Sequence, residues 1–325
     1  MIISRTPMRI SFAGGGTDLR AFYSRYEGAV VSTAINKYVY ITVNRAFDHC
    51  IRVSYSKTEI VDCVDEIKHN LIREAMKFSD VTEGVEITSI ADIPAKGTGL
   101  GSSSSYLVGL LNALYAYKGQ FQSPKKLAEG ACEIEIEILG EPIGKQDQYI
   151  AAYGGLQYIQ FNPDESVYVD PVICFKDTKT AFQNNLMLFY TNITRNASSI
   201  LKKQQKKTAD KLDALKRMKG IGDEINDVLR ANRDMSRIGN LLDENWRLKK
   251  SLVEGISLDV IDSYYGKAIA AGALGGKLLG AGGGGFLLFY VEAQNRESVR
   301  RALSDLGMVE FEFEPQGSKI IYIEE

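Results

Sequence analysis

Hydrophobic and polar residues alternate along some segments of the chain and recur every three or four residues along others. Alternation, together with β-branched and aromatic content, predicts strands at residues 29–44, 50–56, 85–93 and 154–161. Helical spacing is clearest in residues 102–117, where Leu107, Leu110, Leu111 and Leu114 fall at i, i+3, i+4 and i+7. This pattern predicts a helix with one buried face. With a further helix at 65–78, the first half mixes α and β structure.

Residues 123–139 carry both periodicities. The segment EIEIEI at 133–138 alternates as a strand does. However, Ser123 followed by Pro124 is typical of a helix start, with an N-cap and a proline in the first turn. Leu127, Ala131 and Ile134 also continue a helical stripe. We therefore predict a helix here.

The second half is mostly helical at its centre. A strand at 186–190 precedes a long helical stretch at 197–252, which contains the lysine-rich segment KKQQKK at 202–207. A solvated helix face is the favoured interpretation of these lysines, and a patch for phosphate or an acidic partner is the alternative. The remaining predicted elements are helices at 257–271 and 295–306 and strands at 285–292, 309–314 and 319–323. We place a domain boundary near residue 184, giving domains 1–183 and 184–325.

Composition and charge exclude several classes of protein. The 325 residues are 45% hydrophobic and 25% charged, with a formal net charge of −2, so disorder and a basic nucleic-acid surface are not expected. No apolar run is long enough to span a bilayer, and no apolar signal-peptide region follows Met1. The four cysteines lie far apart, which argues against a zinc site or a disulfide framework. These features predict a soluble, cytoplasmic protein without a nucleic-acid or membrane partner.

Of the 30 glycines, 14 lie in three runs, at 14–16, 97–101 and 272–285. The second run lies within the segment PAKGTGLGSSSS at 94–105, between a predicted strand and a predicted helix. Free N–H groups and the positive end of the helix dipole would face a ligand there, which suits a polyphosphate. The serine hydroxyls could bind phosphate or join a magnesium shell, although a helix cap with a flexible turn is the alternative.

Two common nucleotide motifs do not fit these glycines. No Gly-Lys-Ser/Thr sequence ends the 94–105 segment, so it is not a Walker A loop. Its GxGxG spacing also differs from the dinucleotide fingerprint GxGxxG. Residues 280–285 match GxGxxG formally but precede a predicted strand instead of opening a helix.

Three motifs in the same order resemble those of the GHMP kinases, the family of galactokinase, homoserine kinase, mevalonate kinase and phosphomevalonate kinase. They are TPMRISFAGGGTD at 6–18, PAKGTGLGSSSS at 94–105 and KLLGAGGGGF at 277–286, and together they span nearly the whole chain. The resemblance implies an α+β, two-domain GHMP-kinase fold. Its N-terminal domain would be ribosomal protein S5 domain 2-like and would contain the ATP-phosphate loop 94–105. Its C-terminal domain would be ferredoxin-like and would contain the glycine loop 275–286.

Within this family the chain is most similar to the D-glycero-D-manno-heptose 7-phosphate kinases. The similarity rests on the FAGGGTDL sequence at 12–19, INKY at 35–38 and GKQDQY at 144–149. It implies transfer of the γ-phosphate of ATP to the anomeric hydroxyl, in nucleotide-activated heptose biosynthesis, with Mg²⁺ as cofactor. Galactokinases carry Gly-Glu-His-Thr-Asp where this chain has GGGTD at 14–18, which argues against galactose as the acceptor.

The resemblance also implies catalytic residues. Asp147 matches the aspartate near the phosphoryl acceptor and would accept the proton of the acceptor hydroxyl. It could instead act as an electrostatic anchor without proton transfer, or as a helix cap. Arg9 matches the basic residue beside the reacting oxygens, and its alternative is an ion pair at a strand edge.

The binding residues follow from the same motifs. The ATP-binding set would be Lys96, Gly97, Gly99, Leu100, Gly101, Ser102, Ser103 and Ser104, with Lys96 equally interpretable as a solvated lysine. The substrate-binding set would be Gly15, Gly16, Thr17, Asp18, Arg195 and Gly283, with Asp18 holding a sugar hydroxyl. Arg195, Lys37 and Arg20 are the candidates for holding the phosphate of the acceptor.

Glu135 and Ser103 are implied as magnesium ligands, and helical geometry supports the glutamate independently. On a helix, Glu135 falls beside the apolar stripe, whereas Glu133 and Glu137 point towards solvent. An unpaired charge beside an apolar stripe is costly, so a cation should lie near Glu135. A metal ion and a salt bridge both satisfy that requirement.

Two other functions remain open from the sequence. One is a kinase for an unphosphorylated sugar such as fucose or galactose. The other is a catalytically silent protein that senses sugar and ATP, although the presence of Asp147, Glu135 and Arg9 argues against it. The exact acceptor, its anomer, the oligomeric state and allosteric regulation do not follow from the sequence.

Overall fold

The computed structural model describes residues 1–93, 97–194, 197–232 and 234–324, and it contains one large and one small β-sheet. The large sheet has the order β12-β1-β2-β5-β3-β4, with β6 and β7 continuing from β2. Its strands are β1 (Ile2–Ala13), β2 (Gly28–Arg45), β3 (Ile51–Ser54), β4 (Thr58–Val61), β5 (Val85–Ala91), β6 (Leu156–Phe161), β7 (Val167–Pro171) and β12 (Lys319–Ile323). All pairs are antiparallel except β3 with β5.

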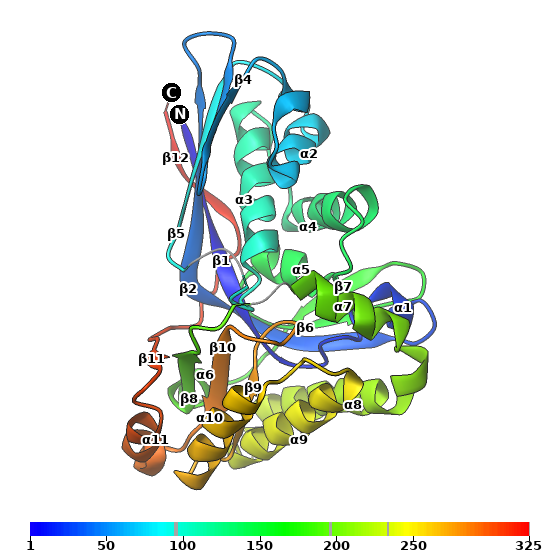
Figure 1. Cartoon of the computed structure of the whole chain (residues 1–325), viewed down its shortest axis with the longest axis vertical. Coiled ribbons are helices and arrows are strands. Elements are labelled where there is room, and N and C mark those ends of the chain that lie inside the picture. The colour runs from blue at the N-terminus through cyan, green and yellow to red at the C-terminus, as the bar shows by residue number, and fades with distance from the viewer. Residues whose placement is uncertain (94–96, 195–196, 233, 325) are drawn as a thin grey trace.

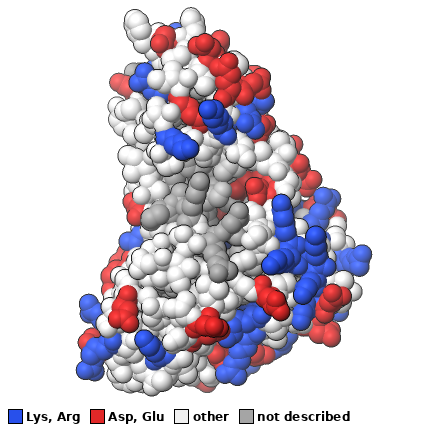
Figure 2. Space-filling view, viewed as in Figure 1, with Lys and Arg blue, Asp and Glu red and all other residues white. Residues whose placement is uncertain are grey.

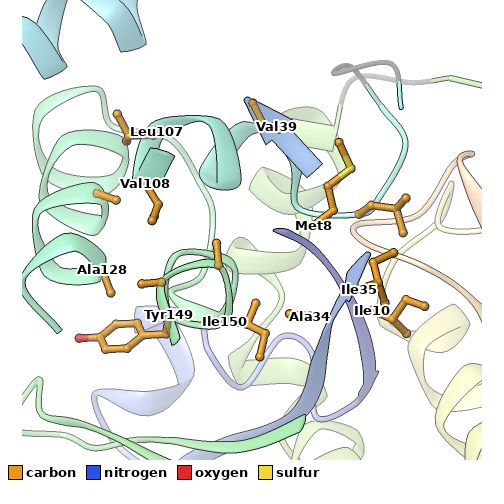
Figure 3. Packing of buried hydrophobic residues seen from close by; sticks show 14 of the residues in the cluster. Met8, Ile10, Ala34, Ile35, Val39, Leu107, Val108, Ala128, Tyr149 and Ile150 are labelled. Atoms are coloured by element: carbon orange, nitrogen blue, oxygen red, sulfur yellow. The ribbon is translucent and has the colours of Figure 1, made fainter. Parts of the chain in front are cut away.

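Helices cover one face of the large sheet (Figure 1). They are α1 (Arg20–Tyr23), α2 (Asn70–Phe78), α3 (Ser102–Tyr117), α4 (Pro124–Cys132), a π-helical turn (Glu133–Ile138) and α5 (Gln146–Tyr153). Side chains of α3, α4 and α5 pack on one side of β1 and β2, where Figure 3 shows Ala34 beside Ile150, whereas Ile10 and Ile35 lie on the other side of the strands. This packing fixes the N-terminus of α3 against the middle of β1.

The small sheet is antiparallel and has the order β11-β8-β10-β9. Its strands are β8 (Leu186–Tyr190), β9 (Gly275–Leu278), β10 (Phe286–Tyr290) and β11 (Gly307–Met308). The helices of this part are α6 (Lys176–Asn184), α7 (Ala197–Lys206), α8 (Leu212–Ala231), α9 (Ser236–Leu252), α10 (Asp259–Ala270) and α11 (Arg296–Ala302). A hydrophobic cluster that includes Trp246 and Phe289 forms the core of this part.

The α+β, two-domain prediction is confirmed by this arrangement. The chain nevertheless returns to the first sheet, because β12 pairs with β1 and brings the two termini side by side (Figure 1). The boundary at residues 183 and 184 stays a prediction. None of the helices in the described ranges combines the length and the apolar character needed to cross a bilayer.

The helix predicted at residues 123–139 is confirmed over the alternating pattern. Ser123 accepts a hydrogen bond from the Lys126 N–H and caps α4, and Pro124 occupies its first turn. The EIEIEI segment continues as a π-helical turn, which buries Ile134 and Glu135. The local start signal therefore outweighed the strand-like alternation.

The predicted strand at residues 309–314 is wrong. Its backbone N–H groups are divided among several acceptors: Val309 donates to Leu188 O, Phe313 to Gln183 Oε1 and Glu314 to Ala34 O. The segment therefore crosses from the small sheet to the large one and pairs with neither as a continuous ladder. Only an isolated bridge between Phe313 and Ile35 has strand geometry.

The lysine-rich segment forms the outer face of α7. Lys202, Lys203 and Lys206 are exposed, as is Lys207 just after the helix, which confirms the solvated-face interpretation of their position. Figure 2 shows Lys and Arg side chains gathered on the right of the molecule, where Figure 1 places α7. The opposite face of α7 is turned inward, since Gln204 is buried.

Candidate functional site

Arg9, in β1, joins the motifs at 6–18 and 94–105 through both its backbone and its side chain. The Arg9 N–H donates to Leu100 O at 3.0 Å, so β1 holds the glycine loop before α3. Its guanidinium donates to Gly99 O at 2.5 Å through Nη1. The same group binds Asp147 at both carboxylate oxygens, from Nε to Oδ1 at 2.7 Å and from Nη2 to Oδ2 at 2.8 Å. Arg9 is only 3% exposed, so this pair is a rigid part of the site.

Asp147 lies in the first turn of α5 and does not cap it. Both of its carboxylate oxygens accept from Arg9, and the hydrogen bonds found in the described residues include none from an α5 backbone N–H to this side chain. The Asp147 side chain also remains about one-quarter exposed, whereas that of Arg9 is buried. A carboxylate oriented by an arginine and open towards a cavity can receive a proton from a bound hydroxyl.

Gly101 brings the N-terminus of α3 close to this pair. It is the N-cap of α3 and has φ +72°. A Cβ there would lie 3.1 Å from Arg9 Cγ and 3.3 Å from Asp147 Oδ2, so a side chain would be tightly packed as well as strained at this positive φ. The N-terminal N–H groups of Ser102, Ser103 and Ser104 therefore lie beside the Arg9–Asp147 pair, where an anionic group is stabilised.

The glycine loop before α3 is also packed against the third glycine run. A Cβ at Gly99 would lie 2.5 Å from Leu279 O, and one at Gly285 would lie 2.3 Å from Thr98 O. The two loops lie about 180 residues apart in the sequence and touch backbone to backbone. Their glycines are required by this contact as well as by any approach to a ligand.

Gly99→Ala is expected to lower the free energy of unfolding by about 3 kcal/mol, because a backbone clash adds to the cost of a left-handed residue. Gly119→Ala is the matched control. Gly119 has φ +71°, close to the +77° of Gly99, but no atom lies within 4 Å of a Cβ built there. Its substitution should cost about 1 kcal/mol. Urea unfolding measures both, and equal losses would contradict the tight contact between the loops.

Glu135 is the buried carboxylate of the site. It is 2% exposed and accepts hydrogen bonds from Ser103 Oγ at 3.2 Å, Ser104 Oγ at 2.7 Å and Gln148 Nε2 at 2.5 Å. Burial raises the pKa of Glu135 from 4.5 to about 7, against the lowering effect of these hydrogen bonds. Within the described ranges no lysine or arginine forms an ion pair with it, so the salt-bridge alternative is not what the structure shows.

These residues fit a magnesium ion. Mg²⁺ takes hard oxygen ligands, usually one or two carboxylates with water and phosphate oxygens. Glu135 and the Ser103 hydroxyl supply such oxygens at the N-terminus of α3. The described residues contain no group of three or more His, Cys, Asp or Glu side chains that could hold a metal alone. Ser104 makes the shorter contact with Glu135, so it is as well placed as Ser103.

Asp18 lies two residues after the first glycine run and lines the same cavity as Asp147. Its Oδ1 accepts from the Gly16 N–H at 2.8 Å and its Oδ2 from Gln146 Nε2 at 2.9 Å. Burial raises the pKa of Asp18, and the nearby Asp147 carboxylate adds to this shift. Thr17 is also buried, but its hydroxyl donates to Gly14 O and Ala29 O and so supports the loop itself.

A cavity of about 80 Å³ lies between these groups. Its lining includes Arg9, Gly15, Gly16, Asp18 and Asp147 from the predicted site. It also includes residues that sequence reasoning did not select: Ser11, Leu19, Ile143, Gly144, Gln146, Leu201, Lys249, Lys277, Gly280 and Ala281. Arg9, Asp18 and Asp147, all named from the sequence, thus meet in one cavity, whereas Glu135 is not among its lining residues.

Lys249 and Lys277 are the two cations that the sequence analysis missed. Lys277 donates from Nζ to Ser11 O at 2.7 Å and Phe12 O at 3.0 Å, which ties β9 to β1. Burial lowers the pKa of both lysines. A signal was present for Lys249, because it continues the buried stripe of Leu242 and Trp246 on α9. A charged residue beside the apolar stripe of a helix is also the signal that identified Glu135.

The remaining predicted site residues are placed as follows. Lys96 and Arg195 lie outside the described residues. Gly283 donates its N–H to Ile256 O at 2.9 Å and is not among the cavity-lining residues, whereas Gly280 and Ala281 of the same loop are. Arg20 forms surface ion pairs with Glu137 and Glu165, and neither it nor Lys37 lines the cavity.

Comparisons with known proteins match both halves of the chain to one family. The family model of the GHMP kinases N terminal domain matches residues 63–155, and that of the GHMP kinases C terminal domain matches residues 225–307. The chain is 30% identical to a D-glycero-alpha-D-manno-heptose 7-phosphate kinase of Campylobacter jejuni, over 98% of both chains. It is 28% identical to an L-fucokinase/L-fucose-1-P guanylyltransferase of Bacteroides fragilis, over 93% of this chain and 35% of that protein.

The fold is also similar to that of a solved structure. The crystal structure of a D-glycero-D-manno-heptose 1-phosphate kinase from Bacteroides thetaiotaomicron superposes with a TM-score of 0.82 and 25% sequence identity. The match covers 100% of both chains. The fold and the order of the two domains are therefore shared along the full length.

Proposed function

The chain belongs to the GHMP kinase family, and we propose that it transfers the γ-phosphate of ATP to the anomeric hydroxyl of D-glycero-D-manno-heptose 7-phosphate. The observation that carries the proposal is the Arg9–Asp147 pair, which lies beside the N-terminus of α3 and opens on a cavity that also contains Asp18. The relative of Campylobacter jejuni, similar over nearly its full length, supports heptose 7-phosphate as the acceptor rather than fucose or galactose.

In this proposal the N-terminus of α3 holds the ATP phosphates. Gly97, Gly99 and Gly101 have positive φ and turn the backbone, while Leu100 lies buried between them. The N–H groups of Ser102, Ser103 and Ser104 face the phosphate oxygens with the positive end of the helix. Lys96 would contribute from the same loop. Glu135 and Ser103 would hold Mg²⁺, which when bound would stabilise the negative charge on the phosphate oxygens.

Asp147 would accept the proton of the anomeric hydroxyl as its oxygen attacks the γ-phosphorus and the bond to ADP breaks. Arg9 fixes both carboxylate oxygens of Asp147 and uses three of its five N–H donors, so two remain for developing negative charge on the transferred group. Positioning of the two substrates supplies the rest of the acceleration.

The sugar would lie against the first glycine run. Asp18 would accept a sugar hydroxyl, and Gly15 and Gly16 would let the ring approach the backbone. Thr17 would hold the loop, with Gly283 and Arg195 as further substrate contacts. We place the reaction in the cytoplasm, where ATP is available.

Coupled release of ADP with a panel of acceptors tests the proposed function. The panel contains D-glycero-D-manno-heptose 7-phosphate, unphosphorylated heptose, fucose, galactose and hexose phosphates. We expect turnover with the heptose 7-phosphate at a kcat/KM at least about tenfold above every other acceptor. Turnover on fucose or galactose with no gain from a phosphate would favour the kinase of an unphosphorylated sugar. ATP binding without transfer to any sugar would contradict the enzyme assignment.

A further inference from the structure

Lys249 is a buried cation to which no residue in the described part of the chain offers an anionic contact. It extends from α9 into the cavity and is 6% exposed. Among the residues that the structure describes, its Nζ donates no hydrogen bond and forms no ion pair, whereas the adjacent Lys250 pairs with Asp262 at 2.8 Å. Burying an unpaired ammonium group is costly, so this position favours a ligand that is anionic.

The other two cavity-lining cations direct most of their donors to protein oxygens: Arg9 uses three of its five N–H groups and Lys277 two of its three. Arg9 binds Asp147 and Gly99 O, and Lys277 binds the carbonyl oxygens of Ser11 and Phe12. Lys249 therefore has three N–H donors that no described protein group uses. The lining carries three cations, Arg9, Lys249 and Lys277, against the two carboxylates of Asp18 and Asp147, which leaves one positive charge in excess.

The Nζ of Lys249 lies on the sugar side of the cavity. A Cβ built on Gly15 would be 3.9 Å from Lys249 Nζ and 3.8 Å from Gln146 Nε2. Asp18 is the carboxylate whose charge acts most on Lys249, and it is already satisfied by Gly16 and Gln146. The glycine loop at the N-terminus of α3 contacts Arg9 and Asp147 instead. Lys249 is thus placed for the acceptor rather than for ATP.

Two further polar atoms of the lining are buried and unpaired within the described part of the chain. They are Ser11 Oγ, on β1, and Gln146 Oε1, beside Asp18. The hydroxyl can donate a hydrogen bond to a phosphate oxygen, and the amide oxygen can accept one from a sugar hydroxyl. Lys249 Nζ and Ser11 Oγ can thus donate hydrogen bonds to an anion, and Gln146 Oε1 can accept one from a hydroxyl group of the same ligand.

We propose that Lys249 Nζ, with Ser11 Oγ, binds the phosphate monoester of the sugar-phosphate acceptor and so makes the enzyme prefer a phosphorylated sugar. This assignment rests on the proposed function, because it presupposes a phosphorylated acceptor in the cavity. A neutral hydroxyl would leave Lys249 without an anionic partner in the described lining, whereas a phosphate monoester supplies one. Lys249 is a binding and specificity residue here and takes no part in phosphoryl transfer.

Lys249→Met is the variant that tests this role, with Lys250→Met as its matched control. Loss of a charge-assisted contact should raise KM for heptose 7-phosphate roughly 10- to 100-fold, with kcat and KM for ATP within about threefold of wild type. The kcat/KM for unphosphorylated heptose should change less than about threefold, so the preference for the phosphate collapses. Lys250→Met should behave as wild type. Thermal unfolding should show Lys249→Met to be at least as stable as wild type.

The alternative outcomes are distinct. An equal loss on phosphorylated and unphosphorylated heptose, or a rise in KM for ATP alone, overturns the assignment of Lys249. Wild-type enzyme that requires the 7-phosphate, together with a Lys249→Met variant that still requires it, also overturns it and leaves the proposed function intact. Wild-type enzyme with no turnover on any sugar phosphate instead overturns the proposed function.

A measurement on wild-type enzyme keeps the assignment testable even where the variant does not fold. Inorganic phosphate should inhibit competitively against heptose 7-phosphate, because both occupy the site at Lys249. It should not compete with unphosphorylated heptose, which leaves that site empty. Inhibition that is competitive with ATP instead, or no inhibition at all, contradicts a phosphate site at Lys249.

Discussion

Asp147→Asn is expected to lower kcat roughly 10²- to 10⁴-fold, the contribution of a well-placed general base. Asparagine has nearly the shape of aspartate but cannot take a proton from the acceptor hydroxyl. Its amide N–H₂ group would also face the Arg9 guanidinium at one of the two positions where a carboxylate oxygen now accepts. Coupled ADP release measures kcat, and calorimetry measures whether ATP and sugar still bind. We expect binding to remain within about fivefold of wild type.

A structural role for Asp147 predicts a different result. Asp147 lies in the first turn of α5, where an acidic side chain also interacts with the helix dipole. Asp177→Asn is therefore the matched control, since Asp177 is an exposed acidic residue in the first turn of α6. A loss of stability without a loss of kcat in Asp147→Asn would assign the residue to the helix. Unchanged turnover would contradict its catalytic role.

Much of the site could be predicted because its residues carry local signals. The glycine loop before α3 lies between a strand and a helix whose patterns are both clear, and the structure places Gly101 as the helix N-cap. Glu135 was identified by its angle on a helix, and the structure buries it while Glu133 and Glu137 remain exposed. These inferences needed only the periodicity of a single helix.

The rest of the site depends on contacts between distant segments. Lys249 enters the cavity from α9, more than two hundred residues after Arg9, and no local pattern indicates which cavity a buried lysine faces. The segment at residues 309–314 has strand composition, but its N–H groups bond to two sheets. Likewise, Gly280 packs against Gly99 and Gly285 against Thr98, although these pairs lie about 180 residues apart in the sequence. Tertiary pairing decides such features, and local composition does not.

Glu135→Gln is expected to reduce ATP-dependent turnover roughly 10²-fold or more and, at the same time, to stabilise the protein at neutral and alkaline pH. The amide keeps the shape and one acceptor oxygen but lacks the negative charge that a magnesium ion requires. Coupled ADP release over a range of Mg²⁺ concentrations measures the first effect. Higher Mg²⁺ should recover little of the loss, because the charge of the ligand is gone.

The stability effect follows from the raised pKa of Glu135. The folded protein retains this proton up to about pH 7, whereas the unfolded chain releases it near pH 4.5. The contribution of Glu135 to the free energy of unfolding is therefore fully present below about pH 4.5 and is lost as the pH rises to about 7. The loss is on the order of 3 kcal/mol, and Glu135→Gln removes it. Urea unfolding in Mg²⁺-free buffer at several pH values measures this difference.

Glu133→Gln is the matched control, because Glu133 is exposed on the same π-helical turn that buries Glu135. It removes an equal charge from the same segment, so it should keep both wild-type turnover and the wild-type dependence of stability on pH. A Glu135→Gln variant that is less stable at pH 8 would show that the carboxylate stabilises the fold through its hydrogen bonds with Ser103, Ser104 and Gln148. A more stable but inactive variant means that the chain retains a costly buried charge because the reaction needs it.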